Sequence, residues 1–107
     1  MRRVAQVIRV LPDKVDEYRE LHRNVPRPVL DRLRGCHITN YSIHLLGDQL
    51  FAYFEYRGDD LAADLAAMAE DPATQEWWRR TAPCQRPVDE AAPGEWWADM
   101  EQVFLMK

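Results

Sequence analysis

The chain has 107 residues, of which 47% are hydrophobic and 30% are charged, a composition typical of one globular domain and not of a disordered chain. The formal net charge of −4 gives no electrostatic reason to expect nucleic acid or an anionic membrane as a partner. No apolar run approaches the roughly 20 residues that span a bilayer. We therefore expect a single cytoplasmic domain over residues 1–107.

The first element is a strand over residues 3–10, which are rich in valine and isoleucine. Polar residues interrupt this run, so it does not resemble the apolar core of a signal peptide. Pro12 and Asp13 resemble a helix start, and we expect a helix over residues 13–24. A second, short helix is expected over residues 28–34, with Gly35 as its C-terminal cap.

Two strands are predicted next, over residues 37–46 and 50–56. The tight-turn signal Gly47-Asp48 between them predicts a hairpin. Apolar residues occur on both side-chain rows of the strand over residues 50–56, where Phe51 and Tyr53 alternate with Leu50, Ala52 and Phe54. A sheet with one solvated face shows a cleaner alternation. We therefore expect a ligand or a second copy of the chain to cover the open face of the sheet.

An alanine-rich helix is predicted over residues 61–70. Asp71 and Pro72 then fit the cap and the first position of a further helix that carries residues 75–81. Three prolines and a glycine indicate a loop over residues 82–100. The chain is expected to end with a strand over residues 101–106.

The order of these elements is βαββαβ, the split βαβ pattern. It predicts an α+β, ferredoxin-like fold, with a four-stranded antiparallel sheet and helices on one face. We find no internal repeat and no low-complexity tract.

Tyr18 and His22 are four residues apart on the first predicted helix, so their side chains share one face. Val15 lies on the same face, which therefore points toward the sheet. A histidine in such a place can transfer a proton near neutral pH. The alternative is a core histidine whose ring is hydrogen-bonded to a neighbour, and spacing alone favours this alternative.

Four tryptophans occur as two adjacent pairs. Trp77 and Trp78 lie on a helix, where neighbours point about 100° apart, so one can pack in the core while the other lines a pocket. Indole rings stack on the C–H faces of sugars, but packing in the core or at a dimer contact explains both residues as well. Trp96 and Trp97 lie in the predicted loop. Aromatic residues of a loop can cover a site, lie in an interface or pack against their own domain.

Tyr41 lies in the middle of a predicted strand, on the side-chain row of His37, Thr39, Ile43 and Leu45. The change along this row from polar to apolar residues suggests the mouth of a pocket. His44 falls on the opposite row and is expected to be structural or exposed.

Several catalytic motifs are missing from the sequence. It contains no glycine-rich phosphate loop, no Cys-x-x-Cys pair, no zinc-binding histidine spacing and no nucleophile elbow. The two cysteines, Cys36 and Cys84, are expected to be free thiols. The functions that these absences leave open are proton transfer without a cofactor or a metal, and simple binding.

The chain resembles the L-rhamnose mutarotase family over essentially its whole length. The likeness rests on a few short motifs in the same order and spacing: Glu17-Tyr18, His22, Asn40-Tyr41, Gln75-Glu76-Trp77-Trp78 and Glu101-Gln102-Val103-Phe104. One segment departs from the pattern, because Val25-Pro26-Arg27-Pro28 stands where members of the family carry a Trp-Pro pair. This departure bears on the preferred sugar more than on the reaction.

The resemblance implies a homodimer of ferredoxin-like subunits, a dimeric α/β barrel, with one monosaccharide pocket in each subunit. It also implies that His22 is the proton donor, and that Tyr18, Tyr41, Trp77 and Trp78 contact the sugar. The expected reaction interconverts the α and β anomers of L-rhamnose or a related 6-deoxyhexose. In it, His22 protonates the ring oxygen, and a tyrosine hydroxyl or a water takes the anomeric proton.

Three other functions remain open, since one fold hosts many activities. The chain can be a small dimeric-barrel cyclase or a cofactor-independent monooxygenase that acts on an aromatic or polyketide-like substrate. It can bind or degrade haem through His22 or His44. It can also be a sugar-binding module without catalysis.

Overall fold

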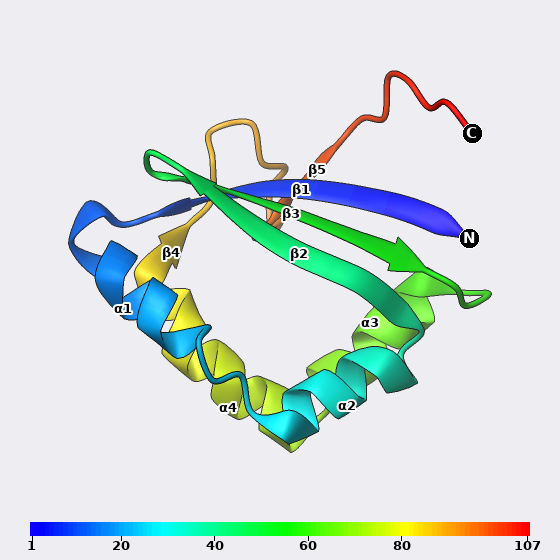
Figure 1. Ribbon diagram of the computed structural model, residues 1–107, viewed down its shortest axis with the longest axis horizontal. Helices are drawn as coiled ribbons and strands as arrows, with labels where there is room; N and C mark the ends of the chain where they lie inside the picture. Colours follow the sequence, from blue (N-terminus) through cyan, green and yellow to red (C-terminus); the bar gives the residue numbers. More distant parts are fainter.

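One curled antiparallel sheet forms the centre of the computed structural model, which describes all 107 residues (Figure 1). Its three long strands are β1 (Arg2–Val10), β2 (Ile38–Leu46) and β3 (Gln49–Tyr56). Strand β3 lies between β2 and β1 and is antiparallel to both. The hairpin expected at Gly47 is present, and this glycine takes the positive φ, +62°, that a tight turn requires.

All the helices lie on one face of the sheet, as predicted: α1 (Val15–Leu21), α2 (Arg27–Gly35), α3 (Leu61–Ala69) and α4 (Pro72–Thr81). A 3₁₀ turn, Pro12–Lys14, leads into α1, which ends earlier than the sequence predicts. None of these helices has both the length and the apolar character needed to cross a membrane. The observed architecture confirms the α+β, ferredoxin-like fold class.

The start of α4 is capped as the sequence predicts. The carboxylate of Asp71 accepts hydrogen bonds from the backbone N–H of Thr74 at 3.0 Å and from its hydroxyl at 2.8 Å. The same carboxylate forms an ion pair of 3.3 Å with Arg32 of α2. These contacts fix the first turn of the helix that carries Trp77 and Trp78.

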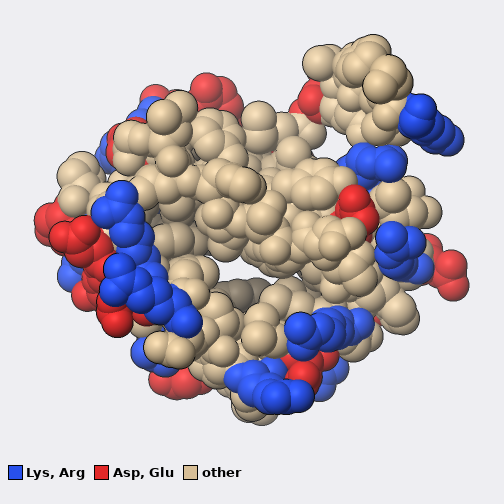
Figure 2. All heavy atoms as spheres, viewed as in Figure 1, with Lys and Arg blue, Asp and Glu red and all other residues tan.

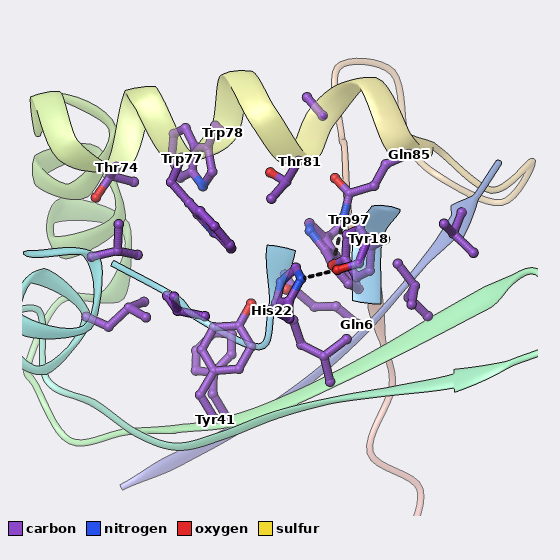
Figure 3. A pocket seen from close by; sticks show the side chains of 18 of the residues that line it. Gln6, Tyr18, His22, Tyr41, Thr74, Trp77, Trp78, Thr81, Gln85 and Trp97 are labelled. Carbon is purple, nitrogen blue, oxygen red and sulfur yellow. Dashed lines mark hydrogen bonds between the residues drawn. The ribbon is translucent and has the colours of Figure 1, made fainter. Parts of the chain in front are cut away.

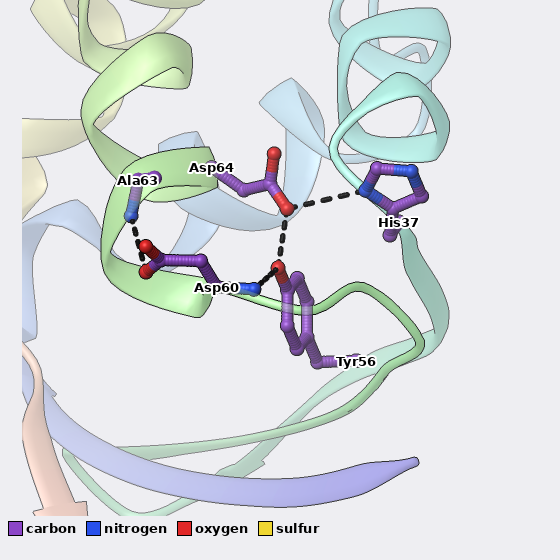
Figure 4. Close-up of polar contacts among 5 residues, drawn as sticks. All are labelled: His37, Tyr56, Asp60, Ala63 and Asp64. Atoms are coloured by element: carbon purple, nitrogen blue, oxygen red, sulfur yellow. Dashed lines mark hydrogen bonds and ion pairs between the residues drawn. The ribbon is translucent and has the colours of Figure 1, made fainter.

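The end of α2 differs from the prediction. Gly35 is the last helical residue and Cys36 is the cap, while the left-handed residue is His37, at φ +66°. The imidazole of His37 pairs with Asp64 of α3 at 3.1 Å, and the hydroxyl of Tyr56 donates to the same carboxylate (Figure 4). His37 therefore joins α2, α3 and the sheet, and does not lie at the mouth of a pocket.

A bulge in β2 decides which residues of this strand face the helices. The register with β3 shifts between Thr39 and Ser42, and Asn40 adopts φ +50°. The bulge changes the alternation, so Ile38 points inward before it and Tyr41 points inward after it. The predicted row of His37 and Thr39 with Tyr41 is therefore wrong.

The last predicted strand is also wrong. Residues 101–107 have no regular structure and leave the sheet (Figure 1). The edge of β1 is instead paired with two short strands from the predicted loop, β4 (Gln85–Arg86) and β5 (Ala98–Met100). The sheet thus has five strands rather than four. Apolar residues alone do not make a strand, because its backbone groups also need partners.

The buried residues on the inner face of the sheet form two separate clusters. One contains Phe54 and Tyr56 with Cys36 and Met68, and the other contains Ile8, Leu50 and Tyr18 with Cys84. The two cysteines are free thiols in different clusters. Between the sheet and the helices the packing is incomplete, which leaves room for a cavity.

Candidate functional site

A cavity of about 1010 Å³ lies between the inner face of the sheet and the helices. Figure 2 shows a hollow between these two layers, with charged side chains mainly on the outer surface of the molecule. Hydrophobic residues make up 20 of the 28 that line the cavity. Such an apolar enclosure with a few converging polar groups is typical of a ligand site.

The polar groups converge at one end of the cavity, where Tyr18, His22 and Tyr41 meet (Figure 3). The rings of Tyr18 and His22 lie 4.3 Å apart between centroids, and the ring of Trp77 meets His22 edge-on at 5.1 Å. The structure therefore brings together the residues that the sequence and the family resemblance singled out on α1, β2 and α4.

His22 is the C-cap of α1, and its imidazole folds back on the last turn of this helix. Its Nδ1 lies 2.8 Å from the backbone carbonyl oxygen of Tyr18. A carbonyl can only accept a hydrogen bond, so Nδ1 carries the hydrogen. In the neutral ring, Nε2 is therefore the unprotonated nitrogen, with a lone pair that can accept a proton.

Burial lowers the pKa of His22 below its usual 6.5, and the bond to the Tyr18 carbonyl opposes this effect only in part. Desolvation disfavours the imidazolium ion because an apolar surrounding stabilises a charge poorly. His22 is therefore neutral at neutral pH.

Tyr18 is buried, with 6% of its surface exposed. Desolvation raises the pKa of its hydroxyl far above the ordinary value, and the neighbouring hydroxyl of Tyr41 adds to this effect. Tyr18 is therefore a neutral phenol that can donate a hydrogen bond. Its oxygen accepts one from the side-chain amide of Gln85 at 3.2 Å.

Tyr41 projects from β2 toward His22, with its ring packed on Phe54 at 5.6 Å between centroids. The residue as a whole is 40% exposed, but desolvation of its hydroxyl raises the pKa to about 12. A second neutral phenol therefore lies at the polar end of the cavity.

Trp77 and Trp78 both line the cavity, but they differ in exposure. Trp77 is 8% exposed and packs against His22, whereas Trp78 is 42% exposed. The guanidinium of Arg80 lies 5.8 Å from the centroid of the Trp77 ring. Trp77 therefore helps to hold the imidazole in place, and its ring offers an aromatic surface beside it.

The loop tryptophans, Trp96 and Trp97, also line the cavity. The indole N–H of Trp96 donates to Gln85 at 3.0 Å. Sequence reasoning missed Gln85, which lies in a segment predicted to be a loop. No local pattern marks it, since it meets Tyr18 only through the fold, 67 residues away in the sequence.

His44 is exposed and bonds to Ser42 at 3.0 Å. No three His, Cys, Asp or Glu side chains are grouped so that they could hold a metal ion. The polar end of the cavity thus offers one imidazole base and two phenols, which are groups suited to transferring protons to and from a small polar ligand.

Comparison with known proteins gives consistent results. A family model described as L-rhamnose mutarotase matches residues 3–106. L-rhamnose mutarotases from Shouchella clausii and Oceanobacillus iheyensis are each 31% identical to the chain, with 99% of both proteins covered.

Two solved structures show the same fold. An L-rhamnose mutarotase from Formosa agariphila superposes with a TM-score of 0.79 at 21% identity, over 100% of each chain. Tetracenomycin F2 cyclase from Streptomyces glaucescens superposes with a TM-score of 0.69 at 14% identity, over 100% of this chain and 98% of the other. The fold is therefore shared by different enzymes, whereas the family model and the two bacterial relatives are specific to L-rhamnose mutarotase. The chain belongs to the L-rhamnose mutarotase family and is a mutarotase, an isomerase that acts on carbohydrates.

Proposed function

We propose that the protein interconverts the α and β anomers of L-rhamnose, or of a related 6-deoxyhexose, at the polar end of the cavity. One observation supports the chemistry above all. His22 donates its Nδ1–H to the Tyr18 carbonyl, which leaves Nε2 as the basic nitrogen of a ring whose centroid lies 4.3 Å from that of the Tyr18 ring. Mutarotation needs such a pair, because one proton must leave the anomeric hydroxyl and another must reach the ring oxygen.

In this mechanism His22 acts first as a base. Its Nε2 takes the proton of the anomeric hydroxyl, the C1–O1 bond becomes a carbonyl, and the bond from C1 to the ring oxygen breaks. The sequence and the family resemblance suggested the opposite first step, protonation of the ring oxygen by His22. The lowered pKa of His22 and the hydrogen bond from its Nδ1–H to the Tyr18 carbonyl favour the base role in the resting protein.

The ring oxygen becomes an alcohol as it leaves, and it requires a proton. Tyr18 is suited to supply that proton, because even a phenol with a raised pKa is more acidic than an alkanol. The open chain then rotates about its C1–C2 bond. On closure the imidazolium of His22 returns its proton to the carbonyl oxygen, and the ring hydroxyl returns its proton to Tyr18. No proton is gained or lost overall.

The aromatic residues position the sugar in this proposal. The face of Trp77 or Trp78 stacks on the C–H groups of the ring, and the hydroxyl of Tyr41 bonds to a sugar hydroxyl. The sugar stays held by these contacts while C1 turns. General acid–base help contributes about 10²–10⁴-fold, which is sufficient for a reaction that proceeds without an enzyme.

Saturation-transfer NMR tests the proposed function directly. Irradiation of one anomeric proton of L-rhamnose is expected to reduce the signal of the other when the protein is added. L-fucose, a second 6-deoxyhexose, reports on the choice of sugar. Binding of L-rhamnose without exchange between its anomers would show a binding module instead of an enzyme.

The base role of His22 predicts a particular pH dependence. Since the imidazole must be neutral, kcat/KM for anomer exchange is expected to stay constant across neutral pH. It should fall only below pH 6.5, the ordinary value from which the pKa of His22 is lowered. The measurement is anomer exchange between pH 5 and 8, corrected for the reaction without protein. A rate that rises as the pH falls would assign His22 the acid role instead.

We also propose that the protein is a homodimer. The outward row of the sheet is apolar where Ala5 and Val7 of β1 run beside β3, with Val7 opposite Phe51. Beyond β5, the tail that leaves the sheet exposes 87% of Val103 and 79% of Phe104. A second copy would cover this apolar surface, as the dimeric α/β barrel of the family resemblance implies.

A change in the tail tests the dimer. Phe104→Asp is expected to weaken self-association about 10²- to 10⁴-fold, because each of the two copies loses a buried phenylalanine that contributes about 1.5–3 kcal/mol. Gln102→Asp adds the same charge to the same tail at a polar position and is the matched control. Sedimentation velocity over a concentration series measures the effect. A monomeric wild-type protein, or equal behaviour of the two variants, would contradict the proposal.

A further inference from the structure

Gln85 is a nearly buried polar residue, 7% exposed, between two aromatic side chains of the cavity. The indole N–H of Trp96 donates to its Oε1 at 3.0 Å, and its Nε2 donates to the hydroxyl oxygen of Tyr18 at 3.2 Å (Figure 3 shows Gln85 beside Tyr18). Both functional atoms of the amide are therefore paired across segments that are far apart in the sequence.

The chemistry of the three groups fixes the direction of this chain of hydrogen bonds. An indole N–H can only donate, so the amide must turn its oxygen toward Trp96. Its NH₂ group then faces Tyr18, and the phenol oxygen must accept. The Tyr18 hydroxyl makes no other hydrogen bond within the protein, so its own hydrogen is free to point elsewhere.

We propose that Gln85, oriented by Trp96, is a positioning residue that directs the hydroxyl hydrogen of Tyr18 into the cavity toward the ring oxygen of the sugar. This inference rests on the proposed function, because it assigns the residue that keeps Tyr18 a donor. Without Gln85 the phenol could turn its hydrogen toward another acceptor, and a bound sugar would then lose its proton source.

The backbone holds Gln85 firmly in place. Gln85 pairs with Val10 in the sheet, and the N–H of Leu11 donates to the carbonyl of Cys84 at 2.8 Å. Pro83 and Pro87 restrict the chain on both sides. The backbone of residue 85 is therefore fixed before a ligand binds, and the hydrogen bond from Trp96 holds the amide group at the end of the side chain.

Gln85→Glu is the sharpest test, because it keeps the size of the side chain and changes only its hydrogen-bonding character. When ionised, the introduced carboxylate only accepts hydrogen bonds, so it would take one from Trp96 and one from Tyr18, and the phenol hydrogen would leave the cavity. When protonated, the introduced carboxyl group can accept from Trp96 and donate to Tyr18, as glutamine does. The variant therefore switches the direction of the bond with pH.

Other titratable groups lie close to this bond: His22 and Tyr41 in the cavity and Cys84 behind Tyr18. Rates of Gln85→Glu are therefore expressed relative to the wild type at each pH, which divides out the wild-type titration of His22. We expect kcat to be about 10²-fold below the wild type when the introduced carboxylate is ionised, with KM little changed. The ratio should rise as the pH falls. In a Tyr18→Phe background, Gln85→Glu should have no further effect and no such pH dependence.

A spectroscopic measurement separates this inference from the proposed function. With ¹³C in the ζ position of tyrosine, the Tyr18 signal of Gln85→Glu should follow the titration of the introduced carboxyl group, even if the protein does not turn over L-rhamnose. Trp96→Phe, which frees the amide to rotate, is a second variant that changes only a partly exposed residue. It should lower kcat about 10-fold, but not in the Tyr18→Phe background.

Two results would overturn the inference. The first is a Tyr18 signal in Gln85→Glu that does not respond to pH between 4 and 9. The second is an equal loss of kcat from Gln85→Glu or Trp96→Phe whether or not Tyr18 retains its hydroxyl. Absence of anomer exchange in the wild type, together with a Tyr18 signal that follows the introduced carboxyl group, would refute the proposed function but retain the hydrogen-bond direction.

Discussion

Replacing His22 with asparagine is expected to slow anomer exchange of L-rhamnose by about 10²–10⁴-fold. The asparagine amide can still donate to the Tyr18 carbonyl, as Nδ1–H of the imidazole does at 2.8 Å. It offers no basic nitrogen in the position of Nε2. The variant therefore removes the base while keeping the local structure, and the lost activity measures proton transfer. Saturation-transfer NMR gives the rate.

The matched control is His37→Asn. His37 lies outside the cavity, between α2 and α3, and asparagine tolerates its left-handed φ of +66°. This variant is expected to exchange anomers at the wild-type rate. The acid limb of the pH profile should disappear in His22→Asn and stay in His37→Asn. A well-folded His22→Asn protein with wild-type exchange would remove the histidine from the mechanism.

Tyr18→Phe is the second substitution that we expect to slow anomer exchange strongly. It removes the phenol hydrogen and retains the ring that packs against His22 at 4.3 Å. We expect kcat for anomer exchange to fall about 10²-fold, because the ring oxygen then has no proton donor from the protein. KM should change less, since the sugar keeps its contacts with Trp77 and Tyr41. The measurement is anomer exchange at several L-rhamnose concentrations.

Tyr53→Phe is a suitable control for this loss. Tyr53 lies on the outward row of β3, and its hydroxyl donates to Glu55 at 2.8 Å, away from the cavity. Its removal should leave kcat unchanged. If Tyr18→Phe also retains full activity, another donor protonates the ring oxygen, and Tyr41 is the nearest phenol to examine. The position of Gln85 would then have no catalytic consequence.

The enclosure of the cavity acts on the titratable groups in opposite directions. Burial lowers the pKa of the imidazole and raises the pKa of both nearby phenols, because an apolar surrounding disfavours every charged form. The same enclosure therefore keeps the imidazole unprotonated and both phenols protonated at neutral pH, which is the state that the proposed mechanism requires. Trp77 contributes to this enclosure by packing nearly perpendicular to the ring of His22.

Local patterns in the sequence were sufficient for most of the fold. Neighbours in the chain decide the strands β1 and β3, which are rich in residues that favour strands, and also the Gly47 turn and the Asp71 cap. The structure contains all of these features. The prediction of a strand over residues 101–106 was wrong because a strand depends on more than its own residues. It needed a partner strand, and the edge of β1 is occupied by β4 and β5.

The sequence by itself determined the fold class through the order of its elements, and helical spacing placed Tyr18 and His22 on one face. Spacing alone favoured a core histidine, and only the family resemblance marked these two residues as functional. Only the tertiary structure decided what these residues can do. The burial that lowers the pKa of His22 includes the packing of Trp77 beside it, and the hydrogen bond that the Tyr18 hydroxyl accepts comes from Gln85, 67 residues away. Proton affinity and hydrogen-bond direction depend on the surroundings in space, and no local pattern of residues encodes those surroundings.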